Sequence, residues 1–125
     1  MDRVQWKKYK DKKILYVNYS KLIFRNPLEK KEILDTINKA REVVAATDEK
    51  IRFLSDVTDS VADKDIIQAL KDFAKYTASS NKIEKECVVG ITGIQKVIVS
   101  SINLFAKSKL VIMDDLQKGM DWLVE

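Results

Sequence analysis

The feature that most constrains this chain is a regular alternation between short apolar runs and longer amphipathic stretches. Runs rich in β-branched and aromatic residues are separated by stretches in which apolar residues return every three or four positions. We therefore predict the order β-β-α-β-α-β-α-β-α. Alternation of this kind is typical of a mostly parallel sheet whose strands are joined by helical, right-handed crossovers. The predicted fold class is α/β, with a mixed, mostly parallel sheet of about five strands and about four helices.

The first two strands are predicted to form an antiparallel hairpin. They span Val4–Tyr9 and Ile14–Tyr19 and flank the polar turn Lys10–Lys13. Polar residues interrupt the first strand, whereas Ile14–Val17 is apolar on both faces, so we place the first strand at the edge and the second inside. The many lysines of the hairpin are typical of an edge strand that resists aggregation. An anionic partner is the alternative, because basic and aromatic residues are interleaved there.

The other elements follow from periodicity and from their first residues. Asn26 is expected to cap a helix of about twenty residues, with Pro27 at its first position and Glu29 bonding back to the cap. The remaining elements are predicted as a strand at Ile51–Val57, a helix from the cap Asp63 to near Ser80, a strand at Glu86–Ile91, a helix opened by the capping box Thr92–Gln95 and ending near Ala106, a strand at Lys109–Met113, and a final helix capped within Asp114–Gln117.

The helix predicted at Ile94–Phe105 is apolar around most of its circumference. Its apolar residues include Val97, Ile98, Val99, Ile102 and Leu104. A helix of this kind is expected to be buried, to act as a lid, or to form a contact between two copies of the chain. A homodimer is therefore one of the expected alternatives.

The chain of 125 residues has the size of one domain, which we place at residues 1–125. It contains no apolar run near the eighteen residues that a membrane span needs, and its first residues lack the apolar core of a signal peptide. Its one cysteine, Cys87, has no partner within the chain for a disulfide. A cytoplasmic location is the expectation that follows.

The chain has no histidine, which excludes histidine-based acid–base catalysis, nucleophile–histidine pairs and most zinc sites. Asp56, Asp59 and Asp63 lie between a predicted strand and a helix, where they could hold a divalent cation or serve as loop and cap residues. We favour the second interpretation because caps recruit aspartate wherever helices start. Cys87 is expected to be a buried, inert thiol. No metal, cofactor or catalytic residue is predicted.

The segment Gly90-Ile91-Thr92-Gly93 links a predicted strand to a predicted helix. Free backbone N–H groups at such a helix start can receive an anion. The segment lacks the further glycine of the dinucleotide fingerprint and the Gly-Lys-Ser/Thr ending of the phosphate loop. A tight strand-to-helix turn is the favoured interpretation, and the anion site is the alternative.

Several phrases, taken in order, carry a family resemblance that runs from about Ile14 to Leu123. They are Ile14–Ser20, Ser55–Thr58, Leu70–Ala74, Val88–Gly93 and Met120–Leu123. Together they resemble a bacterial family of small STAS-like proteins, which are related in fold to the sporulation anti-sigma-factor antagonist. Their order and spacing carry the resemblance more than any single phrase.

The resemblance implies a non-catalytic module that binds protein partners, nucleotides or small ligands. A related branch resembles the lipid-carrying CRAL-TRIO fold. Partner-switching antagonists of the wider group are phosphorylated at the start of the helix after the third strand. The matching stretch here, 56–61, offers Thr58 and Ser60, but it lacks the Asp-Ser-Ser-Gly-Leu-Gly type of motif.

The leading functional prediction is a STAS-like binding module, regulatory or ligand-sensing, with a protein or small ligand as its partner. Its surface would lie at the carboxyl ends of the strands, where open α/β sheets place ligands. The alternatives are a carrier of an apolar or lipid-like ligand and, with least support, a metal-dependent enzyme. We do not expect a nucleic-acid partner. The predicted binding residues are Asp56, Thr58, Asp59, Ser60, Gly90, Thr92 and Gly93.

Overall fold

Five strands form one mixed sheet in the computed structural model, which describes residues 2–93 and 95–125. The sheet order is β1-β2-β3-β4-β5, with β1 antiparallel to β2 and every other pair parallel. The predicted mixed sheet, with the first strand at its edge, is confirmed. The strands are β1 (Val4–Tyr9), β2 (Lys12–Asn18), β3 (Ile51–Asp56), β4 (Ile83–Val89) and β5 (Val111–Met113).

Four helices complete the predicted β-β-α-β-α-β-α-β-α order. They are α1 (Pro27–Ala46), α2 (Lys64–Ser80), α3 (Gln95–Ala106) and α4 (Leu116–Val124). Ile94, which we expected in the third helix, lies outside the described residues. None of the described helices is long and apolar enough to cross a membrane.

The fourth strand begins and ends earlier than predicted. It starts at Ile83 rather than Glu86. The prediction missed the first half of the strand because Glu84 and Lys85 are polar. β5 pairs only with Cys87–Val89, so this first half of β4 tolerates polar residues. The strand ends before Gly90, whose φ of +84° is incompatible with a continued strand.

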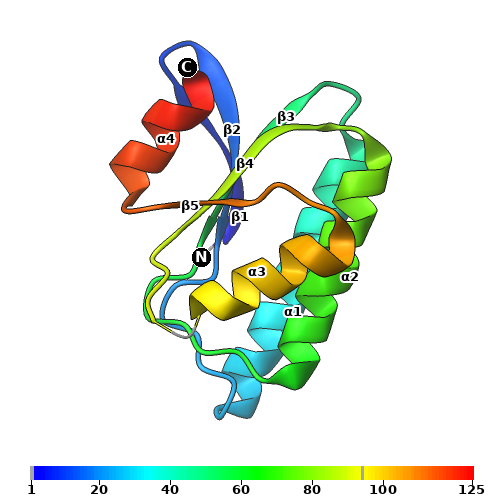
Figure 1. The fold of residues 1–125 in the computed structure, drawn as a ribbon, viewed down its shortest axis with the longest axis vertical. Coiled ribbons are helices and arrows are strands. Elements are labelled where there is room, and N and C mark those ends of the chain that lie inside the picture. Colours follow the sequence, from blue (N-terminus) through cyan, green and yellow to red (C-terminus); the bar gives the residue numbers. More distant parts are fainter. Residues whose placement is uncertain (1, 94) are drawn as a thin grey trace.

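The helices divide between the two faces of the sheet. α1, α2 and α3 cover one face, and α4 covers the other (Figure 1). Two apolar cores result. One core, centred on Leu15, Phe53 and Phe73, lies below α1 and α2, and the other, which includes Leu54 and Leu123, lies below α4.

α1 begins as predicted, except for the role of one side chain. The Asn26 carboxamide oxygen accepts from the backbone N–H of Leu28 at 3.0 Å, and Pro27 takes the first helical position. Glu29 does not bond back to the cap as expected. Its carboxylate instead accepts from the N–H of Ile23 at 3.1 Å, because the preceding loop turns under the helix start.

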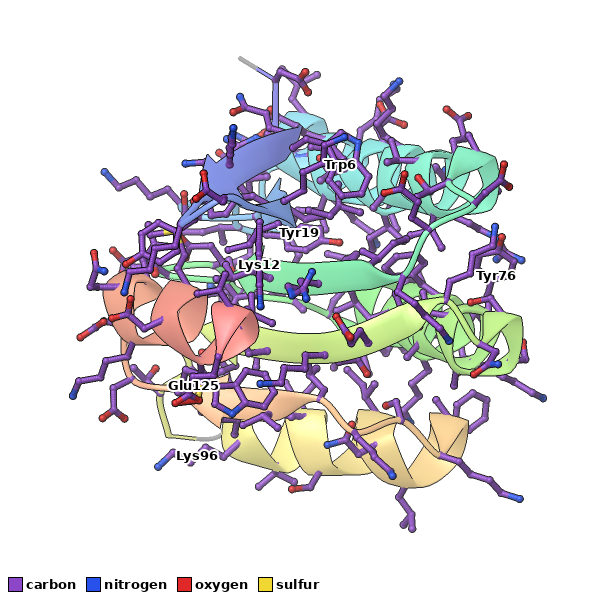
Figure 2. All side chains as sticks on the ribbon, turned by 90° about the horizontal axis from the view of Figure 1, so that it is seen from above. Trp6, Lys12, Tyr19, Tyr76, Lys96 and Glu125 are labelled. Atoms are coloured by element: carbon purple, nitrogen blue, oxygen red, sulfur yellow. The ribbon has the colours of Figure 1, made fainter. Side chains whose placement is uncertain are left out.

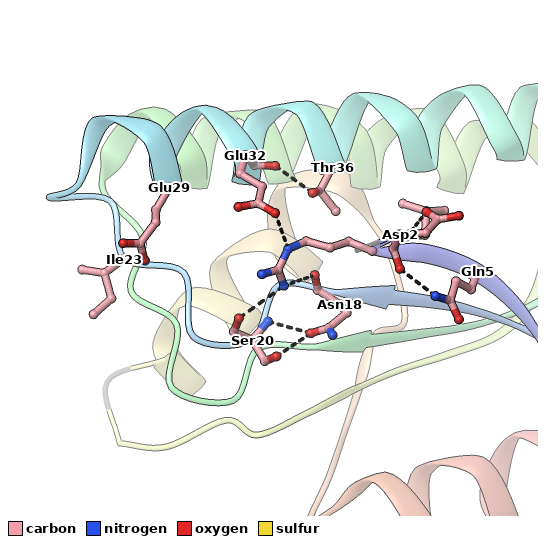
Figure 3. Close-up of polar contacts among 10 residues, drawn as sticks. Asp2, Gln5, Asn18, Ser20, Ile23, Glu29, Glu32 and Thr36 are labelled. Carbon is pink, nitrogen blue, oxygen red and sulfur yellow. Dashed lines mark hydrogen bonds and ion pairs between the residues drawn. The ribbon is translucent and has the colours of Figure 1, made fainter.

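Arg3 connects β1 to α1 and to the loop that follows β2. Its Nε donates to the Glu32 carboxylate at 2.7 Å, and its guanidinium donates to the carbonyl oxygens of Asn18 and Ser20 at 3.0 and 3.3 Å (Figure 3). With only 15% of its side chain exposed, Arg3 is well shielded for a charged residue. The contacts hold the edge strand and the first helix in one arrangement.

α3 packs against α2, and only its inner side is covered. Val99, Ile102 and Ala106 are buried, whereas Val97 and Leu104 on the outer side are exposed. Burial, one of the three roles expected for this helix, therefore holds for its inner side only.

α4 approaches the sheet closely at Gly119. A Cβ atom at this position would lie 3.0 Å from a Val89 methyl carbon, 3.2 Å from a Leu54 methyl carbon and 3.3 Å from the Cys87 sulfur. Two residues further along, the helix is tied to β1, where the Tyr9 hydroxyl donates to Asp121 at 2.5 Å.

The close approach at Gly119 predicts a position-specific intolerance of bulk. We expect Gly119→Leu to lower the free energy of unfolding by about 3 kcal/mol, because the side chain would force α4 away from the sheet. The control is Lys118→Leu, at the exposed neighbouring position, which should change it by less than about 0.5 kcal/mol. Urea unfolding followed by circular dichroism measures both. Equal effects of the two substitutions would contradict this packing.

Candidate functional site

Two connections meet at the carboxyl edge of the sheet. Residues 57–63 join β3 to α2, and residues 90–93 follow β4 on the way to α3. Because β3 and β4 are parallel neighbours, their carboxyl ends lie side by side. A Cβ atom on Gly90 would lie 2.3 Å from the Thr58 hydroxyl oxygen and 2.6 Å from the Thr58 backbone nitrogen. The two connections are therefore in direct contact at Gly90 and Thr58.

Asp56 organises the start of the first connection. One of its carboxylate oxygens accepts from the Thr58 N–H at 3.0 Å and from the Thr58 hydroxyl at 2.6 Å. The other accepts from the Tyr16 hydroxyl at 3.0 Å. Burial, and then the nearby Asp56 carboxylate, raise the pKa of Tyr16 to about 12. Asp56 thus has its partners within the protein and acts as a brace for the loop.

The three aspartates considered for a cation site do not converge. Asp63 caps α2 by accepting from the Ile66 N–H at 3.0 Å, as predicted, and it pairs with Lys30 at 2.7 Å. The Lys30 ammonium lowers the pKa of the Asp63 carboxyl. Asp59 is exposed, with a left-handed φ of +56°. Across residues 2–93 and 95–125, no group of three acidic or cysteine side chains is arranged to hold a metal ion.

Both hydroxyls considered for phosphorylation already make hydrogen bonds. Thr58 donates to Asp56, and Ser60 donates to the Val57 carbonyl at 2.8 Å. Neither lies in the first turn of α2, which begins only at Lys64 behind its cap. A phosphate on Thr58 would therefore face the Asp56 carboxylate and break the hydrogen bonds that brace the loop.

Gln95 links the second connection to the first. Its side-chain oxygen accepts from the Thr92 N–H at 3.1 Å, which is the part of the predicted capping box that forms. Its side-chain nitrogen donates to the Ser60 carbonyl at 2.8 Å. One carboxamide thus ties the start of α3 to the loop that follows β3.

An apolar cavity of about 110 Å³ lies between α3 and the sheet, and it is partly open to solvent. Its floor includes Ser55 of β3 and Val88 of β4. Its walls include Leu70 of α2, and its roof includes Ile98 and Ile102 of α3. The cavity exists because α3 stands on α2 and leaves a space above the strands.

The predicted residues differ in their relation to this cavity. Ser60 lines it, and Gln95 lies beside Ser60 at its edge. Asp56 does not line it, because Tyr16, its partner, belongs to the core below α4 on the opposite face of the sheet. Gly90 and Thr58 contact each other but do not line the cavity, and Gly93 has open space around it. Of the predicted binding residues, Ser60 is the one that lines the cavity. The sequence also named Ile98 and Ile102 in a possible lid, but it did not indicate the floor.

The sheet order also affects whether a ligand is expected at the carboxyl ends of the strands. Strand order never reverses along this sheet, so the crevice that forms at a reversal in doubly wound folds does not arise. The case for a ligand therefore depends on the cavity itself.

Comparison with protein-family models, with curated proteins and with solved structures finds no match to this chain. The STAS-like resemblance stays a prediction from the sequence.

Two glycines of the second connection provide a matched test of the loop contact. Gly90→Ala should lower the free energy of unfolding by about 3 kcal/mol, because it combines a positive φ with a collision against Thr58. Gly93→Ala has a positive φ but no neighbour within 4 Å, so it should cost about 1 kcal/mol. Denaturant unfolding compares them. A cost for Gly90→Ala no larger than that for Gly93→Ala would disprove the close contact.

Buried ionisable groups predict a loss of stability at alkaline pH. Burial raises the pKa of the Cys87 thiol to about 12, and it raises the pKa of the Tyr16 hydroxyl to about 12 as well. The unfolded chain releases these protons from about pH 9 upward, whereas the folded chain keeps them. The unfolded state then binds fewer protons, so stability falls as pH rises from about 9 to 12, by up to about 1.4 kcal/mol per pH unit for each group.

Tyr16→Phe is the variant that isolates one of these groups. Its free energy of unfolding at pH 7 should be about 1–2 kcal/mol lower than that of the wild type, because the hydrogen bond to Asp56 is lost. Its stability should then fall less steeply above pH 9, because one titrating group has been removed. Urea unfolding at pH 7 to 11 measures both effects. An unchanged alkaline slope would show that Tyr16 does not titrate as its burial requires.

Proposed function

We propose that this protein is a non-catalytic, STAS-like binding domain that holds a small apolar ligand in the cavity beneath α3. The observation that carries the proposal is the cavity itself, whose lining is almost wholly apolar. The hydroxyl-bearing residues Tyr19, Ser55 and Ser60 also line it. An apolar chamber with a few polar groups is the usual composition of a small-molecule site.

The volume limits the class of ligand. Typical ligand pockets measure about 300–1,000 Å³, whereas an apolar cavity of about 150 Å³ is already sufficient for benzene. At about 110 Å³, this cavity is smaller than that, so as it stands it suits a short branched aliphatic group, and a single aromatic ring needs the space gained when α3 shifts outward. An entire lipid requires more space than α3 leaves in this arrangement. The proposal is therefore narrower than the lipid carrier expected as an alternative.

The edge of the cavity provides a route from ligand binding to a regulatory signal. A ligand that lifts α3 would strain the Gln95–Ser60 hydrogen bond, and that bond connects α3 to the loop 57–63. The same loop is braced by Asp56 and packed on Gly90. Occupancy of the cavity would then alter the surface at the carboxyl edge of the sheet. This is the behaviour expected of a ligand-sensing module.

The proposal is tested with toluene as a probe of the cavity. Toluene should raise the melting temperature of the wild-type protein and shift amide NMR signals of the lining residues, because binding to the folded state alone stabilises it. Val99→Phe, which fills the cavity from α3, should abolish both responses. Ala62→Leu fills it from the loop and serves as a second blocking variant.

The matched control is Val97→Phe, two residues away on the same helix but 67% exposed. It should respond to toluene like the wild type. The proposal is wrong if toluene leaves the wild-type spectrum unchanged, or if the filled variants respond as strongly as the control. Native mass spectrometry of gently purified protein then identifies any ligand carried from the host.

A further inference from the structure

The outer side of α3 carries apolar side chains that the protein leaves uncovered. Leu104 is 85% exposed, Val97 is 67% exposed and Phe105 is 46% exposed. Val97 and Leu104 are seven residues apart, so they lie on the same side of the helix two turns apart. Single exposed apolar residues are common, but three on one surface helix indicate an interaction surface.

Lysines surround this apolar strip. The ammonium groups of Lys71 and Lys75 on α2 lie 5.7 and 5.8 Å from the centre of the Phe105 ring. Lys96 in the first turn of α3 and Lys107 just beyond its last residue are both exposed. No acidic residue occurs in the sequence between Glu86 and Asp114. The strip is therefore bordered by positive charge, with no negative charge on the α3 segment itself.

We propose that the outer side of α3 docks on an anionic lipid surface. Leu104, Val97 and Phe105 insert among the acyl chains near the headgroups, and the surrounding lysines bind the phosphate groups. The short apolar strip is complementary to the acyl-chain region of such a surface, and the flanking lysines are complementary to its anionic headgroups.

The shape of the strip favours lipid over a protein partner. A stable protein interface buries about 800 Å² on each side around a densely packed centre. Here the protruding Val97 and Leu104 are separated along the helix by Ser100 and Ser101. A fluid lipid layer accommodates separate protruding side chains without a matching pocket. A side chain as exposed as Leu104 can therefore be buried in it completely.

The basic β1–β2 hairpin is the competing site for an anionic surface. Figure 2 shows Trp6 of the hairpin and Lys96 of α3 on opposite sides of the molecule. The two sites therefore cannot lie flat on one membrane together. Binding through the hairpin would depend on its lysines, such as Lys8 and Lys13, and would not require Leu104.

Vesicle sedimentation of the full chain distinguishes these sites. Vesicles contain three parts phosphatidylcholine to one part phosphatidylglycerol, and pure phosphatidylcholine vesicles serve as the uncharged reference. The wild-type protein should bind the anionic vesicles more strongly. Leu104→Ser should lower the partition coefficient about tenfold or more, and Lys75→Gln and Lys96→Gln should each lower it about fivefold.

The matched controls lie away from α3. Leu28→Ser removes an 80%-exposed leucine at the start of α1, and Lys8→Gln with Lys13→Gln removes two hairpin charges. Each control should bind within about twofold of the wild type, and circular dichroism should show every variant folded. The proposal is overturned if the folded wild type binds neither vesicle, as expected for a protein partner. It is also overturned if the hairpin variant loses binding while Leu104→Ser retains it.

Discussion

The arrangement of this protein depends on the mismatch between strand spacing and helix spacing in a sheet that winds in one direction. Neighbouring strands lie about 4.8 Å apart, whereas packed helices lie about 8–10 Å apart. Because β2 to β5 follow one another in order, right-handed crossovers place α1, α2 and α3 on one face. Three helices packed side by side therefore form a layer that is wider than the strands that they connect. α3 consequently stands against α2 at the margin of the sheet, with a cavity on its inner side and an uncovered outer side.

The same margin explains why the two loops at the carboxyl edge are coupled. Gly90 lets the backbone of Thr58 come close, and Gln95 bonds to the carbonyl of Ser60. These contacts hold the start of α3 against the loop that follows β3. The helix that forms the cavity roof is therefore connected to the surface loop, and this connection underlies the proposed ligand-sensing role. The opposite face, where Asp56 and Tyr16 meet, provides bracing.

Much of the fold was predictable because its determinants are local. Caps at Asn26 and Asp63 act on N–H groups two or three residues away, so they can be recognised in the sequence. The role of Glu29 was predicted wrongly, because its partner Ile23 approaches only through the path of a loop. The candidate site was half predictable. Strand ends indicated the loop residues, but Ser55, Leu70 and Ile98 meet only after three separate elements pack together.

The sequence by itself determined the elements, their order and the mixed sheet, because hydrophobic periodicity and capping residues act within a few positions of the chain. It also determined that histidine-based chemistry is excluded. The tertiary structure decided which side of α3 is covered, where the cavity lies and which predicted residues touch it. The physical reason is that these features arise from distances between packed helices and strands. An apolar helix such as α3 has the same sequence whether its outer side faces a core, a membrane or water.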